Sequence, residues 1–180
     1  MLESVPSIMS DQHGIRLALD YLHGRGCRKI CFVSPPAEIS PSDTGVRIEK
    51  FRKFCQDTGQ DFESLFFGTL TPEKVAPLIL EQKPDACFCA SEEYAARIGL
   101  DLKKAGLRIP QDISLMGLEP LYLNECFTPP ITAIRQDFGQ IAKVVTESLY
   151  QAIINGIPPR CEKIPFKLIE RESVRQPPKI

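Results

Sequence analysis

The sequence predicts an α/β fold with a doubly wound parallel sheet, in which helices cover both faces of the strands. Over residues 12–118 the spacing of apolar side chains alternates between a helical and a strand-like period. The strand-like runs are too apolar to have a face in water, which is typical of parallel strands buried between helices. A chain of 180 residues, 43% hydrophobic and 25% charged, is long enough to form such a core without disulfides or metal.

In chain order, the pattern predicts helices and strands in alternation. Apolar residues three and four positions apart predict the helices, and Gly24, Gly59 and Gly106 favour the ends of three of them. Pro72 favours the start of the remaining helix because proline is tolerated in a first turn. The predicted elements are a helix at 15–22, a strand at 29–34, a loop at 35–43, a helix at 48–55, a strand at 65–67, a helix at 72–82, a strand at 85–90, a helix at 94–102 and a strand at 113–118.

After residue 119 the rhythm changes. Thr128–Pro130 interrupts the chain, and residues 131–134 have an extended pattern. Residues 138–155 predict a long helix, and Gly156–Pro159 leads to a last strand at 164–169.

Composition excludes several classes of function. The formal net charge is −1, with 22 basic and 23 acidic side chains mixed along the chain, whereas a domain that grips DNA phosphates usually has a basic excess or stripe. If this protein controls DNA, the contacting surface therefore lies elsewhere. No run of about 18 apolar residues could span a bilayer, and the N-terminus does not resemble a secretory signal. We expect a cytoplasmic protein with no membrane partner.

The seven cysteines favour reduced thiols in a cytosolic core, because their number is odd and they are spread through apolar runs. Cys87 and Cys89 fall on the same face of one predicted strand, where we interpret them as small core side chains. The chain has no CxxC motif and only His13 and His23, so we expect neither a metal site nor a cofactor.

No motif predicts catalysis, and we expect the protein not to be an enzyme. Gly24–Gly26 begins like a dinucleotide fingerprint, but it precedes a strand and lacks the third glycine. Asp43–Gly45 resembles the triplet of aspartic proteases, but it occurs once, and that chemistry needs paired carboxylates. The sequence contains neither a P-loop nor a G-x-S-x-G elbow.

Polar residues follow the predicted strands at the point where a ligand would bind. In open α/β sheets, ligands bind outside the carboxyl ends of the strands. Those ends are followed by Ser34, Gly68, Ser91–Glu92 and Glu119, and Arg47 lies on the helix after the first strand. An arginine fork with carboxylates suits a small polyhydroxylated or charged ligand, although these can equally be solvated loop residues. The pattern alone leaves both interpretations open.

Four segments carry a family resemblance that covers essentially the whole chain. They are Tyr21–Leu22 followed by GCRKI at 26–30, AGLRIPQDISLMGLE at 105–119, FTPPITAIRQ at 127–136 and IERESV at 169–174. In the same order, LacI/GalR-type transcription regulators have H-L-x-x-x-G-H-R-x-I, A-G-L-R-V-P-x-D followed by V-S-V-V-G-F-D, T-P-P-L-T-T-V-R-Q and L-x-x-R-E-S-V. The chain therefore resembles this family.

The resemblance implies a periplasmic-binding-protein-like effector module of type I, made of two α/β subdomains joined by three crossing strands. A small-molecule effector lies between them, and an N-terminal headpiece reads operator DNA as a dimer. On this expectation, residues 1–11 are a remnant of the N-terminal subdomain, 12–135 the C-terminal effector subdomain, 136–160 a crossover helix and 161–180 a return strand and tail. Operator DNA would be contacted only through a headpiece that this chain lacks, and half of the usual pocket wall would be absent.

The resemblance also assigns effector contacts one residue at a time. Arg47 matches the arginine that grips the effector, and Ser91–Glu92 stands where the family usually has Asn-Asp. Departures at positions 70, 91 and 119 leave the ligand open between sugar-like and nucleoside-like. The expected effector-binding residues are Arg47, Leu70, Ser91, Glu92, Glu119, Gln136 and Phe138.

A homodimer is the expected assembly. In the family, the segments equivalent to 93–104 and 121–127 lie in the dimer contact, although Ile98 and Phe127 can equally be core residues. The expected interface residues are Tyr94, Ile98, Leu121, Tyr122 and Phe127. A second candidate contact is the apolar stripe of Ile141, Val145, Leu149 and Ile153 on the long helix.

Two alternatives to a regulator stay open at this point. A solute-binding protein of the same fold would be favoured by a secretory signal, and an α/β enzyme by a nucleophile or metal cluster. We find neither feature in the sequence.

Overall fold

A computed structural model of the chain describes residues 8–10, 14–34, 41–68, 70–119, 123–159 and 161–177. Helices and strands alternate through most of these ranges, as predicted. The elements are β1 (Ile8–Ser10), α1 (Gly14–Gly24), β2 (Ile30–Val33), α2 (Pro41–Thr58), α3 (Phe62–Leu65), α4 (Pro72–Gln82), β3 (Ala86–Cys89), α5 (Glu92–Lys104), β4 (Ser114–Glu119), α6 (Leu123–Cys126), β5 (Thr132–Gln136), α7 (Phe138–Asn155), β6 (Glu162–Ile164) and β7 (Phe166–Ile169).

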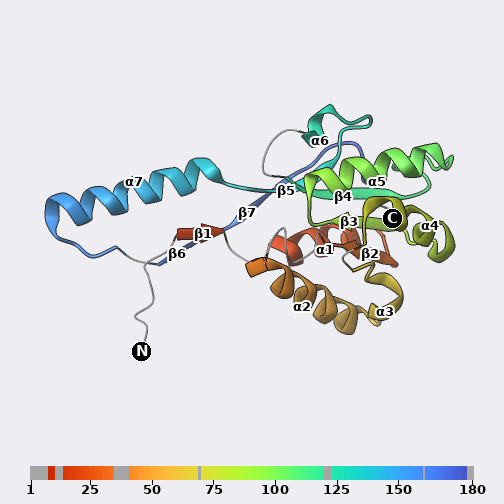
Figure 1. The fold of residues 1–180 in the computed structure, drawn as a ribbon, viewed down its shortest axis with the longest axis horizontal. Coiled ribbons are helices and arrows are strands. Elements are labelled where there is room, and N and C mark those ends of the chain that lie inside the picture. Colours follow the sequence, from red (N-terminus) through yellow and green to blue (C-terminus); the bar gives the residue numbers. More distant parts are fainter. Residues whose placement is uncertain are drawn as a thin grey trace.

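The main sheet has five strands in the order β2-β3-β4-β5-β7. The first four are parallel, and β7 pairs with β5 in the antiparallel direction. Helices α1 and α2 lie on one side of this sheet, and α5, with α4 packed beside it, lies on the other (Figure 1). The predicted doubly wound α/β fold is confirmed.

Aromatic rings and close helix packing fill the core. Phe32 on β2 contacts Phe51 of α2 and Phe88 of β3, with ring centroids 5.1 and 5.5 Å apart. On the other face, a Cβ placed on Gly99 would lie 2.7 Å from Cζ of Phe127 and 2.8 Å from Cδ2 of Leu115. Glycine at this position therefore lets α5 approach the sheet closely.

The prediction of a strand at 65–67 is wrong. Leu65 ends the short helix α3, which begins after Asp61, whose carboxylate accepts a hydrogen bond from the Glu63 backbone N–H at 3.2 Å. Only Phe66 forms a bridge, to Phe32 of β2. The short helix and its C-terminal cap at Phe66 occupy residues that a longer strand would need. The predicted loop at 35–43 is also too long, because α2 begins at Pro41.

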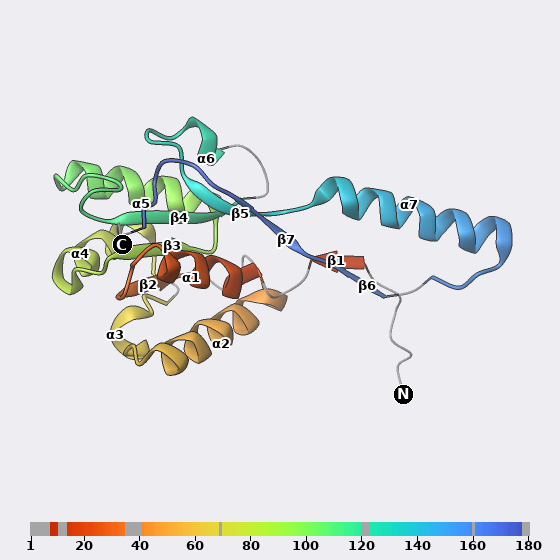
Figure 2. The same cartoon turned by 180° about the vertical axis from the view of Figure 1, so that it is seen from behind.

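A second, smaller sheet lies apart from the main one. Strand β1 pairs with β6 in parallel, and α7 packs against β1 (Figure 2). The single strand predicted at 164–169 is in fact two, because Ile164 pairs with Ser10 of β1 whereas Phe166 pairs with Gln136 of β5. Pro165 separates them, and a proline cannot donate to either ladder.

The segment after β7 clips the start of β4 to the start of β5. Ser173 is fully buried; its hydroxyl accepts from the Thr132 N–H at 2.8 Å and donates to the Leu115 carbonyl at 2.5 Å. The Leu115 N–H in turn donates to the Ser173 carbonyl at 2.9 Å. Arg171 donates to the Ile131 carbonyl at 2.5 Å. Residues 171–174 thus bridge the starts of β4 and β5, which pair directly with each other further along.

Candidate functional site

The parallel strands end along one edge of the main sheet, which we call the carboxyl edge. Residues 33, 89 and 117 are in register across β2, β3 and β4, so the residues that follow lie side by side. Arg47 of α2 reaches this edge, where its Nη1 donates a hydrogen bond to the Ala90 carbonyl oxygen at 3.4 Å. The side chain of Arg47 is half-buried. A guanidinium is therefore held over the end of β3.

Ser91 lies beside that arginine contact and caps α5. Its backbone is extended, with φ −158° and ψ 141°, and its hydroxyl oxygen accepts from the Tyr94 N–H at 3.5 Å. A serine hydroxyl that accepts one bond still has a hydrogen to donate. Ser91 can therefore cap the helix and donate to a ligand at the carboxyl edge.

The neighbouring Glu92 faces a different partner. Its side chain is 8% exposed, and Oε1 accepts from the Asn124 backbone N–H of α6 at 3.2 Å. The Asn124 carbonyl accepts from the Ile131 N–H at 2.8 Å. Glu92 therefore ties α5 to α6 in this structure, a role that we did not predict for it.

Glu119 and Gln136 complete the carboxyl edge at the ends of β4 and β5. Glu119 pairs with Arg135, and Gln136 pairs with Phe166 where β5 and β7 leave the main sheet. Gln136 is half-buried. The backbone thus brings the predicted positions 47, 91, 119 and 136 to one edge.

The two other predicted contacts lie elsewhere. Leu70 lines a hollow of about 440 Å³ beside α3 and α4, together with Phe66 and Leu78. Phe138 begins α7, and 48% of its surface is exposed. The structure therefore does not join these two apolar side chains to the Arg47 cluster.

The residues expected in a dimer contact are mostly core residues. Tyr94 is 8% exposed, Ile98 is 0% and Phe127 is 9%, because α5 presses them onto β4 and α6. The expectation that these three are exposed is wrong, and for Ile98 and Phe127 the core alternative is correct. Leu121 and Tyr122 lie outside the described residues.

Sequence reasoning missed Asn124. Its side chain is fully buried, and neither Nδ2 nor Oδ1 has a hydrogen-bond partner. A Cβ on Gly117 would lie 2.8 Å from Nδ2, so the amide packs directly on β4. The only signal in the sequence was a polar residue inside the predicted contact segment 121–127.

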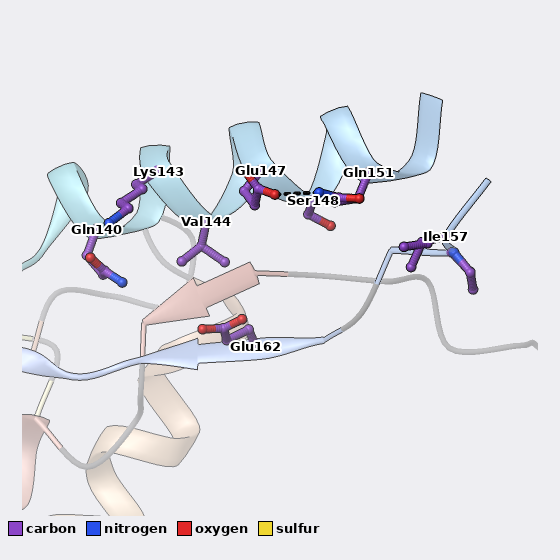
Figure 3. Close-up of a pocket in the computed structure, with 9 residues that line it drawn as sticks. Gln140, Lys143, Val144, Glu147, Ser148, Gln151, Ile157 and Glu162 are labelled. Carbon is purple, nitrogen blue, oxygen red and sulfur yellow. Dashed lines mark hydrogen bonds between the residues drawn. The ribbon is translucent and has the colours of Figure 1, made fainter. Parts of the chain in front are cut away.

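A second hollow, also not predicted, separates α7 from β6. It measures about 490 Å³, and Figure 3 shows Val144 pointing from the helix toward the strands. Along the same helix, Gln151 Nε2 donates to Glu147 Oε1 at 2.7 Å. The residues lining it are Gln140, Lys143, Val144, Glu147, Ser148, Gln151, Ile157, Pro158 and Glu162.

Charged groups fasten the start of α7 to β7. Asp137 caps the helix by accepting from the Gln140 N–H at 3.2 Å, and Lys167 Nζ lies 2.6 Å from its other carboxylate oxygen. The hydrogen bond from Lys167, followed by that from Gln140, lowers the pKa of Asp137. At neutral pH the ionised Asp137 therefore links the start of α7 to Lys167 of β7 through a solvent-exposed ion pair.

Two further features concern the described residues, which are 8–10, 14–34, 41–68, 70–119, 123–159 and 161–177. None of the helices described is both long and apolar enough to cross a membrane. Within those ranges, no three side chains of His, Cys, Asp or Glu are placed to hold a metal ion.

Comparison with known proteins places the chain in a family. Residues 19–174 match the family model of the periplasmic binding protein-like domain. The ribose operon repressor of Halalkalibacterium halodurans is 27% identical over 96% of this chain and 54% of its own length. The PurR repressor of Aliivibrio salmonicida, an HTH-type transcriptional repressor, is 36% identical over 81% of this chain and 45% of its own length.

A solved structure agrees with these relatives. The periplasmic binding protein/LacI transcriptional regulator of Alkaliphilus metalliredigens, complexed with D-xylulofuranose, is 29% identical, with a TM-score of 0.75 over 94% of this chain and 66% of that one. The chain spans about half the length of the curated relatives it matches. The resemblance to LacI/GalR-type regulators is thereby confirmed, and the chain belongs to the periplasmic binding protein-like domain family.

Proposed function

We propose that this chain is the effector-sensing part of a LacI-type transcription regulator and that it has no enzymatic activity. The observation that carries the proposal is the carboxyl edge, where Arg47, Ser91 and Gln136 come from three separate elements. Ligands of open α/β sheets bind at such an edge. The relatives named as repressors support the same function.

We further propose that the ligand biases the angle between two parts of the chain. One part, residues 12–135, contains most of the main sheet; residues 1–11 and 136–160 contribute β1 and α7 to the other, and residues 161–180 return between them. The carboxyl edge faces the crossing, since β5 passes directly into α7. A ligand that prefers one angle shifts the equilibrium toward it, and that preference can be relayed to DNA binding.

A sugar is the ligand class that we favour over a nucleoside. Arg47 supplies a fork of donors, and Ser91 and Gln136 can each donate and accept, which suits adjacent hydroxyl groups. A LacI-family regulator from Enterococcus faecium, 21% identical with a TM-score of 0.80 over 98% of this chain and 68% of that one, has bound ribose. The A. metalliredigens neighbour carries a pentulose.

The remaining partners follow from this role. We propose that the protein acts in the cytoplasm, where operator DNA is reached through a headpiece, and that it works as a homodimer. The described residues offer no disulfide, and all seven cysteines are free thiols. A dimer matches the paired half-sites that helix-turn-helix regulators read.

Titration of the ¹⁵N-labelled chain with D-ribose and D-xylulose, followed by NMR, tests the ligand class and the site together. We expect saturable shifts of the Ser91, Glu119 and Gln136 amides at millimolar sugar. Arg47→Ala should weaken binding about 10- to 150-fold, because a charged donor contributes roughly 1.5–3 kcal/mol.

Arg97→Ala is the matched control, since Arg97 is an exposed arginine paired with Glu73 on α4 at 2.7 Å. Its affinity should equal that of the unchanged chain. Shifts that avoid the carboxyl edge, or equal affinities for the two arginine variants, would refute the site. Saturable binding of a nucleoside in place of both sugars would refute the ligand class.

A further inference from the structure

Glu92 connects the segments that follow two neighbouring strands, directly beside the proposed ligand site. It comes immediately after Ser91, and its carboxylate accepts from the backbone N–H of Asn124 in α6. The segment that contains α6 follows Glu119, the last residue of β4. Because β3 and β4 are paired, this one hydrogen bond ties the segment after Ser91 to the segment after Glu119.

The bond is closed off from solvent. Glu92 is 8% exposed, Asn124 is fully buried, and Oε1 lies 3.2 Å from the backbone nitrogen. The carbonyl of Asn124 accepts from the Ile131 N–H at 2.8 Å. Both main-chain polar groups of Asn124 are therefore satisfied inside the protein, as buried backbone groups usually are, and water does not reach its N–H in this arrangement.

The side chain of Asn124 works against this position of α6, which lies beside α5 (Figure 1). Its Nδ2 and Oδ1 atoms are buried and have no hydrogen-bond partner among the residues that the structure describes. The amide packs on Gly117, where a Cβ would lie 2.8 Å from Nδ2. A buried amide without partners is destabilising relative to one in water. We therefore expect α6 to move outward when an attachment is removed.

Acidic side chains attach α6 on two sides. On the side of β5, Glu125 of α6 lies 2.9 Å from Arg135 and 3.0 Å from Arg171, but its side chain is 46% exposed. Exposed ion pairs contribute little to stability. On the side of α5 the attachment is the buried bond to Glu92, so its removal should free that side of the helix.

We propose that Glu92 is a positioning residue of the ligand site, which acts through α6 and without touching the ligand. Residues 120–122 alone separate Glu119 from α6, so an outward shift of α6 moves the end of β4. A ligand that bonds to Ser91 and Glu119 together then meets the wrong spacing. Where a sugar is the probe, the inference rests on the proposed function.

Spectra without ligand test the position alone. Glu92→Gln keeps an oxygen that can accept from the Asn124 N–H, whereas Glu92→Asp is shorter by one methylene and cannot reach a group already 3.2 Å away. In ¹H–¹⁵N spectra, Glu92→Asp should shift the Glu119 amide and speed hydrogen exchange of the Asn124 amide. Glu92→Gln should change neither. Equal effects of the two variants on both amides overturn the proposal.

Titration with D-ribose gives the second readout. The dissociation constant should rise at least about tenfold for Glu92→Asp, which equals the loss of about one hydrogen bond to the ligand, and stay within about threefold for Glu92→Gln. If the charge of Glu92 instead touched the sugar, Glu92→Gln would weaken binding as much as Glu92→Asp, and that result overturns the proposal.

Ser173→Ala is the matched control, because it removes buried hydrogen bonds at the starts of β4 and β5, away from the carboxyl edge. Its affinity for D-ribose should equal that of the unchanged chain. A loss as large as that of Glu92→Asp would mean that lower stability alone weakens binding, which also overturns the proposal. If the unchanged chain binds no sugar, the proposed function fails, and the spectra without ligand still decide the role of Glu92.

Discussion

Removing the Ser173 hydroxyl is the perturbation with the best-defined cost. Ser173→Ala leaves the Thr132 N–H without its acceptor in a site where both residues are 0% exposed. It also deletes the donor to the Leu115 carbonyl at 2.5 Å. An unsatisfied buried donor costs about 1–3 kcal/mol, so we expect a loss of about 2–3 kcal/mol in the free energy of unfolding. For a chain of this length that corresponds to roughly 4–12 °C in Tm.

Urea unfolding followed by circular dichroism measures this loss as a lower midpoint at unchanged m-value. Ser64→Ala is the matched control, because Ser64 is only half-buried and its hydroxyl donates to the Asp61 carbonyl at 3.3 Å in a hydrogen bond exposed to solvent. We expect less than about 0.5 kcal/mol for it. If Ser173→Ala lowers the free energy of unfolding no more than Ser64→Ala does, residues 171–174 do not stabilise the sheet and our account of them is wrong.

Three further predictions concern packing, charge and thiols. Gly99→Ala should cost about 1–3 kcal/mol in urea unfolding, because its methyl would lie 2.7 Å from a core ring; a neutral result would show that α5 can move away. Hydrogen bonds from the Arg108 side chain, then from its backbone N–H, lower the pKa of Asp112 to about 2, so NMR titration should place the midpoint there. A carboxyl with a lowered pKa stabilises the fold above its ordinary pKa near 3.8, and that contribution is lost as pH falls through 2. Asp112→Asn should therefore reduce stability at pH 6 and not at pH 1.5, and an equal reduction at both would contradict this ion pair. In the native chain a thiol reagent should label Cys126 and Cys161 quickly and the other five only after unfolding, so fast labelling of a third would refute the burial described here.

The carboxyl edge shows how far sequence reasoning reaches into the site. Arg47, Ser91 and Glu119 were predicted to share one edge because parallel strands all end on the same side, and the family resemblance added Gln136. The backbone brings these four positions to that edge. The direction of a side chain does not follow from that rule. Glu92 follows Ser91 directly, yet its carboxylate faces α6.

The sequence did not show which apolar helix faces are buried in the core and which are exposed. Tyr94 and Ile98 of α5 were expected at a contact, but they complete the core because Gly99 lets the helix lie close to β4. The long helix α7 has the same apolar spacing, yet all of its residues are at least partly exposed. Periodicity reports that a face is apolar, and only packing decides what covers it.

The sequence by itself determined the alternation of helices and strands, the doubly wound sheet and the family, because these depend on local periodicity and on short motifs along the chain. The tertiary structure alone decided that the strand predicted at 164–169 is divided between two sheets, that Glu92 holds α6, and that Ser173 joins β4 to β5. Each of these depends on a hydrogen bond between residues more than 30 positions apart. Such a bond is fixed by the register of the whole fold, and neither partner's neighbours in the sequence carry that information.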